Sequence, residues 1–484
     1  MLRSILVASL GLVLSLATSR AVRAAEPVFT PDDAAKALHK AVEFLRTRVA
    51  VEGGYVYVVS EDLKERDGEV KATPKQIWIQ PPGTPAVGLA YLDCYALTKD
   101  KYYLEAARET AEALIRTQLR SGGWWGLAEF DPAEREKDHD YRIDPPGKQP
   151  KRRRSTTLDD NKTQACLRFL IRLDKLLEFK DAKLHECTRY ALDHLASAQF
   201  PNGAWPQEFD GPPDPMKFPV KSASYPETWS REFPKEKYSG RYTFNDNAMA
   251  DAIDVMLEAG ATYEEPHYTN AAIRCGEFIV MAQMPEPQPA WAQQYDVDMH
   301  PAWARKFEPP SITGGESQQL LGTLMYLYRA TGDEKFMKPI PPAIAYLRRS
   351  IMPNGRLARF YELQTNKPLY FTKTYELTYS DADLPTHYGF KISHKLDYLE
   401  AEYKKLMDPK REKAKLTFGS KVQPSAGAMK DAEAAAKALD PRGAWVTEGK
   451  MDHAEEKVRL IDSRVFMKNV VTLARYAGAK AKGK

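Results

Sequence analysis

Two segments of the chain place acidic and amide side chains directly before an apolar, helix-like stretch. The first is Asp159-Asp160-Asn161 and the second is Asn245-Asp246-Asn247. A single Asp or Asn is enough to cap a helix, because its side chain accepts bonds from the first backbone N–H groups. Two adjacent carboxylates and an amide exceed that need, and such oxygens are the hard ligands that calcium prefers. We expect Asp159, Asp160 and Asp246 to hold calcium, with helix capping as the alternative for each residue.

A third segment, from Pro301 to Ser311, gathers two cations between aromatic residues. Arg305 and Lys306 lie between Trp303 and Phe307, and Glu308 and two prolines come next. The prolines restrict the backbone and stiffen the end of this segment. Fixed cations beside aromatic rings suit a polymer of acidic sugars. The alternative interpretation is an Arg–Glu pair on the surface, stacked on the aromatic rings.

The elements that must position these segments form a repeat. Helix-like stretches end in a polar residue, a glycine turn and an aromatic residue, most clearly at Gln118 to Trp124 and at Gln199 to Trp205, with a weaker copy at Arg442 to Trp445. Glycine ends a helix because it adopts a left-handed conformation at little cost. Apolar residues recur at helical spacing over 34–49, 104–119, 166–177, 184–198, 249–258, 320–328 and 465–476. The pattern predicts an all-α fold, specifically an α/α toroid or incomplete barrel of helical hairpins, with long loops forming the site on one rim.

The start of the chain predicts export. A basic beginning, an apolar run too short to span a bilayer and small residues at Val22 and Ala24 indicate a signal peptide over residues 1–24. We expect a secreted or periplasmic protein with no membrane span. The formal charge of +4 includes Arg3, Arg20 and Arg23, which leaves +1 after cleavage, so a global basic field does not explain binding of an acidic polymer.

The rest of the chain divides by composition. We expect a catalytic domain over 25–403, a charged flexible connection over 404–437, a C-terminal helical unit packed on the toroid over 438–478, and a disordered tail over 479–484. The four cysteines lie in helix-like stretches without close spacing, which predicts mostly buried thiols and allows one disulfide.

These segments resemble the pectate lyases of polysaccharide lyase family ten. The family pattern has Asp-Asn before a helix, Asn-Gly-Gly-Trp-Pro-Gln, Thr-Phe-Asn-Asp-x-Ala-Met and Pro-Ala-Trp-Ala-Arg-x-(Phe or Tyr)-Glu-Pro-Pro-Ser. This chain has the corresponding residues in the same order, at 159–163, 202–207, 243–249 and 301–311. The string around Arg305 is the most specific part of this resemblance.

The resemblance implies a lyase that cleaves polygalacturonate by calcium-assisted β-elimination, with no nucleic-acid partner. It assigns Arg305 as the base, and Asn161, Lys373 and His387 as substrate-binding residues. Trp303 and Lys306 are expected to bind substrate because they place an aromatic ring and a cation beside Arg305. Lys373 and His387 stand where the family has arginines, so they are departures. We expect a monomer.

The high pKa of a guanidinium argues against an arginine as the base, whereas the resemblance favours Arg305. A free guanidinium has a pKa above about 12, so we expect a dry site beside a cation to lower the pKa of Arg305. Lys306 is the alternative base.

Two other functions stay open. A glycoside hydrolase acting on uronides would use two carboxylates, for which Asp159 and Asp246 are candidates. A non-catalytic protein that binds acidic polysaccharide would fit the departures at Lys373 and His387.

Overall fold

The computed structural model describes residues 29–146, 152–235, 238, 240–411, 416–452, 454 and 456–479. Over these residues the chain is mostly helical, which confirms that part of the predicted fold class. The predicted signal peptide and residues 480–484 of the predicted tail lie outside the described residues. No described helix is both long and apolar enough to cross a membrane.

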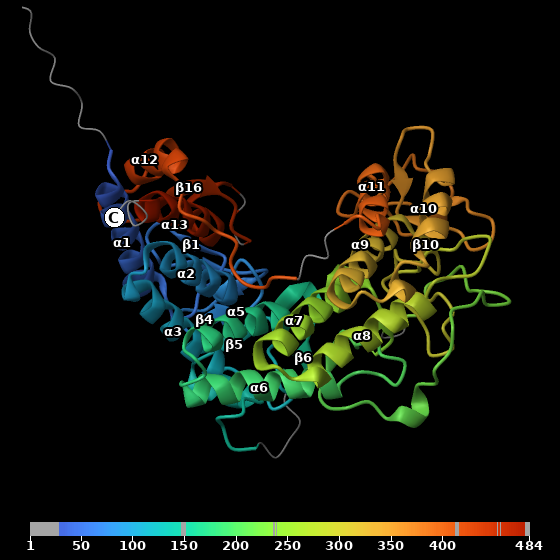
Figure 1. Ribbon diagram of the computed structural model, residues 1–484, viewed down its shortest axis with the longest axis horizontal. Helices are drawn as coiled ribbons and strands as arrows, with labels where there is room; N and C mark the ends of the chain where they lie inside the picture. The colour runs from blue at the N-terminus through green and yellow to red at the C-terminus, as the bar shows by residue number, and fades with distance from the viewer. Residues whose placement is uncertain are drawn as a thin grey trace, which may run out of the picture.

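The helices form two rows that follow an open arc (Figure 1). Neighbours along the inner row contact one another in the order α13 (Ser463–Ala477), α2 (Thr84–Thr98), α5 (Lys162–Leu176), α7 (Ala248–Tyr263) and α9 (Gly314–Thr331). The outer row contains α1 (Pro31–Phe44), α3 (Lys101–Arg116), α6 (Ala182–Ser197) and α8 (Pro266–Met281).

The two ends of the arc carry the remaining helices. Helices α10 (Ile340–Arg349) and α11 (Leu396–Met407) pack with α9 at one end, and α12 (Met429–Lys437) packs with α13 and α1 at the other. The short helix α4 (Pro132–Asp138) belongs to a loop.

Short strands join the loops that precede the inner helices. Antiparallel pairs are formed by β4 (Gln76–Trp78) with β5 (Leu127–Glu129), β6 (Thr156–Thr157) with β7 (Glu208–Phe209), β8 (Tyr242–Thr243) with β9 (Gln294–Tyr295), and β11 (Leu357–Ala358) with β15 (Lys391–Ile392). A four-stranded sheet has the order β10 (Ile312–Thr313), β12 (Phe360–Tyr361), β13 (Pro368–Phe371) and β14 (Leu377–Thr378). These strand pairs link loops that are distant in the sequence.

The C-terminal segment returns to the beginning of the chain. Strand β17 (Val458–Asp462) pairs with β1 (Val58–Ser60), in a sheet completed by β16 (Val446–Gly449), β2 (Arg66–Asp67) and β3 (Lys71–Ala72). Helix α13 packs against both α1 and α2. The first and last elements of the described chain therefore complete one helical unit of the arc.

The predicted repeat has a common hydrogen bond. At the end of an outer-row helix or of α12, a tryptophan indole donates to the backbone carbonyl ten residues earlier, over 2.8–2.9 Å. The bonds are Trp124 to Leu114, Trp205 to Leu195 and Trp445 to Ala435. Each indole N–H is thereby satisfied in the core, as a buried polar group requires.

At the Trp124 and Trp205 turns, a glutamine and a glycine hold one repeat against the next. Gln199 Nε2 donates to Gly203 O at 2.9 Å and to Ala271 O of α8 at 2.8 Å. Gly203 has φ +92°, and a Cβ there would lie 2.3 Å from Arg274 O, also in α8. Glycine is required at this turn both for its conformation and for the close approach of α8.

The sequence patterns missed several helices for a physical reason. Helix α2 lies in the inner row with most of its residues buried, so its sequence has no polar face and no clear helical period. Helix α12 lies within 404–437, where we expected a flexible connection. The four cysteines, Cys94, Cys166, Cys187 and Cys275, are all buried and free, so the allowed disulfide is not formed.

Replacing Gly203 by alanine should destabilise the protein more than replacing Gly355. Both glycines have positive φ, which costs alanine about 1–2 kcal/mol, but a Cβ at Gly355 has no neighbour within 4 Å. The free energy of unfolding of Gly203→Ala should fall further because α8 must also shift. Thermal or denaturant unfolding of both variants measures this; equal losses would show that α8 does not constrain the turn.

Candidate functional site

The two predicted acidic segments begin α5 and α7 with the same unusual backbone. Asp160 and Asn161 have φ 48° and 59°, and Asp246 and Asn247 have φ 50° and 57°. Two successive left-handed residues that are not glycine cost about 1–3 kcal/mol each, and such strain clusters at functional sites. Neither Asn161 nor Asn247, the residues at the cap positions, makes a side-chain capping bond. Capping by these residues therefore does not explain the two segments.

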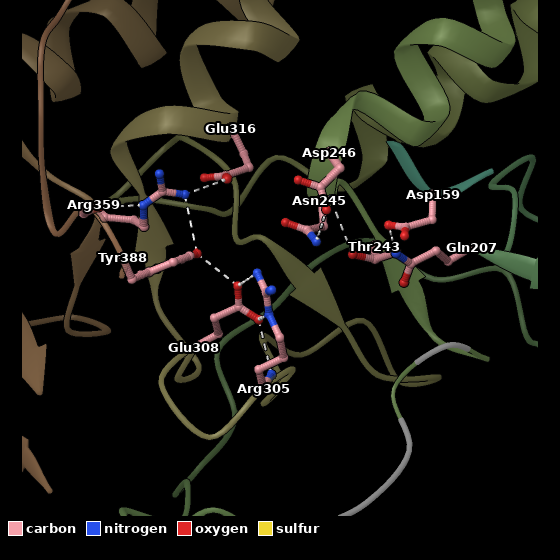
Figure 2. Close-up of polar contacts among 11 residues, drawn as sticks. Asp159, Gln207, Thr243, Asn245, Asp246, Arg305, Glu308, Glu316, Arg359 and Tyr388 are labelled. Carbon is pink, nitrogen blue, oxygen red and sulfur yellow. Dashed lines mark hydrogen bonds and ion pairs between the residues drawn. The ribbon is translucent and has the colours of Figure 1, made fainter. Parts of the chain in front are cut away.

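This backbone brings three carboxylates together. One oxygen from each of Asp159, Asp160 and Asp246 lies within 4.8 Å of the others. Gln207 Nε2 donates to Asp159 Oδ1 at 2.6 Å, and Lys162 Nζ lies 3.0 Å from Asp159 and 3.7 Å from Asp160. Figure 2 shows Asp159 and Asp246 on neighbouring helix starts, with Gln207 beside Asp159.

The electrostatics of this cluster fit a divalent cation. Partial loss of solvent, together with the smaller effects of the charges on Asp160 and Asp159, raises the pKa of Asp246 to about 6. Burial and the charge of Asp159 also raise the pKa of Asp160. Lys162 pairs with Asp159 and Asp160, and among the described residues Asp246 forms no ion pair, so negative charge remains uncompensated. Calcium binds six to eight oxygens, of which these three side chains would supply a part.

Arg305 lies on a tight turn closed by Glu308. The backbone N–H of Glu308 donates to Arg305 O at 2.9 Å, and the Arg305 N–H donates to Glu308 Oε2 at 3.0 Å. The guanidinium also donates from Nε at 2.9 Å and from Nη2 at 2.5 Å to the two carboxylate oxygens. The hydrogen bonds to Glu308 raise the pKa of Arg305 despite its partial burial. This is opposite to the lowering that we expected, because the nearest charge is a carboxylate.

A chain of polar contacts runs from Glu308, the partner of Arg305, to Glu316 (Figure 2). The Tyr388 hydroxyl donates to Glu308 Oε1 at 2.8 Å, and Arg359 Nη1 donates to that hydroxyl at 3.3 Å. Arg359 in turn lies 3.4 Å from Glu316, near the start of α9. The buried carboxylate of Glu308 is thus shared between Arg305 and a second donor, which fixes its orientation and that of Arg305.

Comparison with known proteins agrees with this geometry. Residues 133–357 match the family model of pectic acid lyases. The chain contains a pectic acid lyase domain. The match confirms the resemblance found in the sequence, and it spans Asp159, Asp160, Asp246 and Arg305 but not Lys373 or His387.

Solved structures give more distant similarities. A family 10 polysaccharide lyase from Cellvibrio cellulosa is 21% identical, with 66% of this chain and 96% of that chain covered and a TM-score of 0.43. A mutant of a family 10 polysaccharide lyase from the same organism, in complex with trigalacturonic acid, is 20% identical, with 66% and 97% covered and a TM-score of 0.43. An unsaturated glucuronyl hydrolase specific for heparin is 11% identical, with 93% and 97% covered and a TM-score of 0.39. No curated protein sequence matches the chain.

The three predicted substrate-binding residues inside the pectic acid lyase domain differ from one another in burial and in their contacts. Trp303 is only 6% exposed and donates its indole N–H to Ser230 O at 2.9 Å, so it anchors the loop and offers little open ring surface. Lys306 is exposed, with Nζ 3.6 Å from the centre of the Tyr375 ring. Asn161 accepts a long hydrogen bond from Arg168 at 3.4 Å.

The two predicted residues beyond the matched domain differ from each other. His387 packs edge-on against Phe307, with ring centres 5.2 Å apart, which places it beside the Arg305 loop. Lys373 is exposed and forms an ion pair with Asp383 at 3.2 Å. Among the described residues, the contacts of Lys373 do not join it to the other predicted site residues.

Several contributors were missed from the sequence. Lys162 and Gln207 stand inside the segments that carried the resemblance, so attention to their charge and amide could have found them. Arg359, Tyr388 and Glu316 have no local signal, because they approach Arg305 only through the pairing of distant strands.

Replacing Asp246 by asparagine should stabilise the metal-free protein at neutral pH. A folded-state pKa of about 6 exceeds the ordinary value of about 3.9, so the stability that this group contributes is present below about pH 4 and is lost as the pH rises through about 6. Asp246 is exposed, so screening limits the gain in unfolding free energy to about 1 kcal/mol or less.

Melting temperatures with a chelator measure this gain. Asp246→Asn should melt above the wild type at pH 7, and the difference should vanish at pH 4. Asp298→Asn is the matched control, because Lys221 lowers the pKa of Asp298 and its removal should not stabilise. A lower melting temperature for Asp246→Asn at pH 7 would contradict the predicted repulsion.

Proposed function

We propose that the protein is a pectate lyase that cleaves α-1,4-polygalacturonate by calcium-assisted β-elimination and releases 4,5-unsaturated oligogalacturonides. The observation that carries the proposal is the cluster of Asp159, Asp160 and Asp246 within 4.8 Å, in the same pectic acid lyase domain as Arg305. The electrostatic effect of Arg305 on Asp246 supports their proximity, since Arg305 lowers the pKa of Asp246 against the larger effects that raise it.

The proposed roles follow from charge. Calcium held by the three aspartates would neutralise the substrate carboxylate as a Lewis acid, which makes the adjacent C5 proton easier to remove. Arg305, in its neutral form, takes the C5 proton and becomes a guanidinium. The C5–H electrons form the C4–C5 double bond as the C4–O bond breaks, and the glycosidic oxygen leaves with that bond's electron pair and takes a proton from water. Glu308 orients the guanidine group through its paired hydrogen bonds.

The spacing of the carboxylates disfavours the glycoside hydrolase. Two catalytic carboxyl groups in such enzymes are about 5–5.5 Å apart when configuration is retained and about 6.5–9.5 Å apart when it is inverted. Here Asp159, Asp160 and Asp246 approach within 4.8 Å. These oxygens are closer than the inverting separation, and three carboxylates that converge on one point suit joint ligation of one cation.

The proposal includes the wider context that the sequence predicts. We propose that the helical arc is an incomplete α/α toroid and that the protein is exported as a monomer after removal of residues 1–24. Polygalacturonate would then meet the site outside the cytoplasm, where calcium is available.

Activity on polygalacturonate should require calcium. Incubation should produce the ultraviolet absorbance of an unsaturated uronate, a chelator should abolish it, and added calcium should restore it. The reason is the uncompensated charge of the aspartate cluster. New reducing ends without this absorbance would instead support the hydrolase, and binding without any cleavage would support the non-catalytic protein.

Arg305→Ala and Arg305→Lys should each lose about 100–10,000-fold in kcat while oligogalacturonate still binds. Lysine keeps the charge but not the planar, paired geometry on Glu308, so it should not restore activity. The wild-type rate should also rise with pH over the neutral and alkaline range, because a base with a raised pKa is mostly protonated there.

Arg349→Ala is a suitable control, since it removes an exposed arginine on α10. Circular dichroism and melting curves must accompany the rates, because loss of the Arg305 pair leaves Glu308 buried. An Arg305→Ala variant that keeps more than about a tenth of wild-type turnover is inconsistent with a catalytic base. In that case Lys306 becomes the candidate.

A further inference from the structure

A pocket of about 550 Å³ borders the loop that carries Arg305. Its apolar lining includes Trp303, Leu369 and Phe371, and its polar lining includes Lys306, Arg231 and Tyr379. This volume and this mixture, mostly apolar with a few polar groups, are typical of sites for small ligands. The steps proposed above do not use this pocket, although the sequence predicts that Trp303 and Lys306 bind substrate.

Lys306 is the available cation of this pocket. Its ammonium group contacts the Tyr375 ring, and no described carboxylate forms an ion pair with it. Arg231, the other cation in the lining, is paired with Glu362, and Lys373 is paired with Asp383. Lys367 lies over the Tyr379 ring but is not part of the lining. A cation–π contact at an exposed site contributes only about 0.5–1 kcal/mol. The Lys306 charge is therefore free to bind an anionic group.

The part of the pocket lining that contains Arg231 and Tyr379 is held in place by the buried carboxylate of Glu362. Glu362 accepts hydrogen bonds from Arg231, from the Tyr379 hydroxyl at 2.7 Å and from Thr365. Only 4% of the Glu362 side chain is exposed, so these partners are needed to compensate its charge. This holds the segment around Arg231 against the end of β14, and a wall ordered before binding lowers the entropic cost of binding.

The position of Lys306 next to Arg305 limits which ligand the pocket can bind. Lys306 directly follows Arg305, and consecutive Cα atoms are about 3.8 Å apart. A polymer whose reacting sugar lies at Arg305 therefore reaches Lys306 within a few sugar units. The aromatic rings suit the C–H face of a pyranose ring, and the ammonium group suits its carboxylate. Glu232 and Glu376 also border the pocket, but both are exposed, so solvent and salt screen their charges.

We propose that this pocket is a remote subsite for an acidic sugar of the same polymer. Lys306 binds the carboxylate of a uronate unit away from the scissile bond, and the rings of Tyr375 and Tyr379 contact the sugar. This inference rests on the proposed lyase function and adds to it a preference for longer substrates.

The test compares trigalacturonate with hexagalacturonate. In the wild type, kcat/KM should be higher for the hexamer. Lys306→Ala should lower kcat/KM for the hexamer about tenfold through KM, in keeping with the loss of one charged hydrogen bond, and should leave the trimer unchanged. Lys395→Ala, which removes an exposed lysine at the start of α11 outside the pocket, is the matched control and should change neither.

Calorimetry separates this inference from the proposed function. Hexagalacturonate should bind Arg305→Ala about tenfold more tightly than Arg305→Ala/Lys306→Ala, by the same loss of one charged hydrogen bond, whether or not the wild type cleaves it. Equal affinities, or an unchanged hexamer KM in Lys306→Ala, would overturn the subsite while the lyase function stands. A collapse of kcat on both substrates would also overturn it, since Lys306 would then take part in the chemistry. A wild type without unsaturated product but with the affinity difference would overturn only the lyase function.

Discussion

Mutual repulsion of three carboxylates is the constraint that the site is built to withstand. At less than 5 Å, two such charges repel by about 1–3 kcal/mol in surroundings between bulk water and a protein surface. The chain holds Asp159, Asp160 and Asp246 at this spacing by straining the backbone at the starts of α5 and α7 in the same way. Strands β6 and β8, each paired with a strand from the following loop, hold these starts. Lys162 and Gln207 offset part of the charge, and the remainder makes the cluster selective for a cation.

The second group of charged residues, around Arg305, consists of paired opposite charges rather than of charges that repel one another. Glu308 is only 2% exposed, and a buried carboxylate is tolerated when it is paired and fully hydrogen-bonded. Arg305 provides the pair, and Tyr388 provides a further donor that is itself held by Arg359. Glu316 then balances Arg359. Positive and negative groups alternate along this chain, so the guanidinium is held rigidly without a net buried charge. The same pairing that positions Arg305 also disfavours its neutral form.

The sequence predicts the repeating parts of this molecule better than its unique parts. The turns at Trp124, Trp205 and Trp445 were visible because glycine and tryptophan recur at fixed spacing, and each has the same indole hydrogen bond. The acidic starts of α5 and α7 were visible because two adjacent carboxylates exceed what capping needs. Helix α2 was missed because burial on most sides removes the periodicity on which such predictions depend.

Side-chain environment was harder to predict than residue identity. Trp303 and Phe307 suggested open rings around Arg305, but Trp303 is buried in the loop that it anchors. Without a metal ion the pKa of Arg305 is raised, because Glu308, three residues away, folds back onto it; the expected lowering referred to a site that holds a cation. Whether a nearby Arg and Glu pair, and whether an aromatic ring faces solvent or core, depends on strands such as β12 and β13. Their partners are distant in the sequence.

The helical arc explains why these groups meet on one rim. Three successive inner helices, α5, α7 and α9, begin there, and each carries a carboxylate at or just beyond its N-terminal end: Asp160, Asp246 and Glu316. The N-terminal end of a helix carries partial positive charge, so it stabilises these anions and reduces the cost of gathering them. At the first two starts Lys162 pairs with Asp159 and Asp160 but forms no ion pair with Asp246, so negative charge is left for a cation. At the third start Arg359 neutralises the charge of Glu316. Arg359 also donates a hydrogen bond to Tyr388, which in turn holds Glu308. One architectural feature, repeated along the arc, thus yields an acidic cluster that could hold a metal ion at two helix starts and a support for Arg305 at the third.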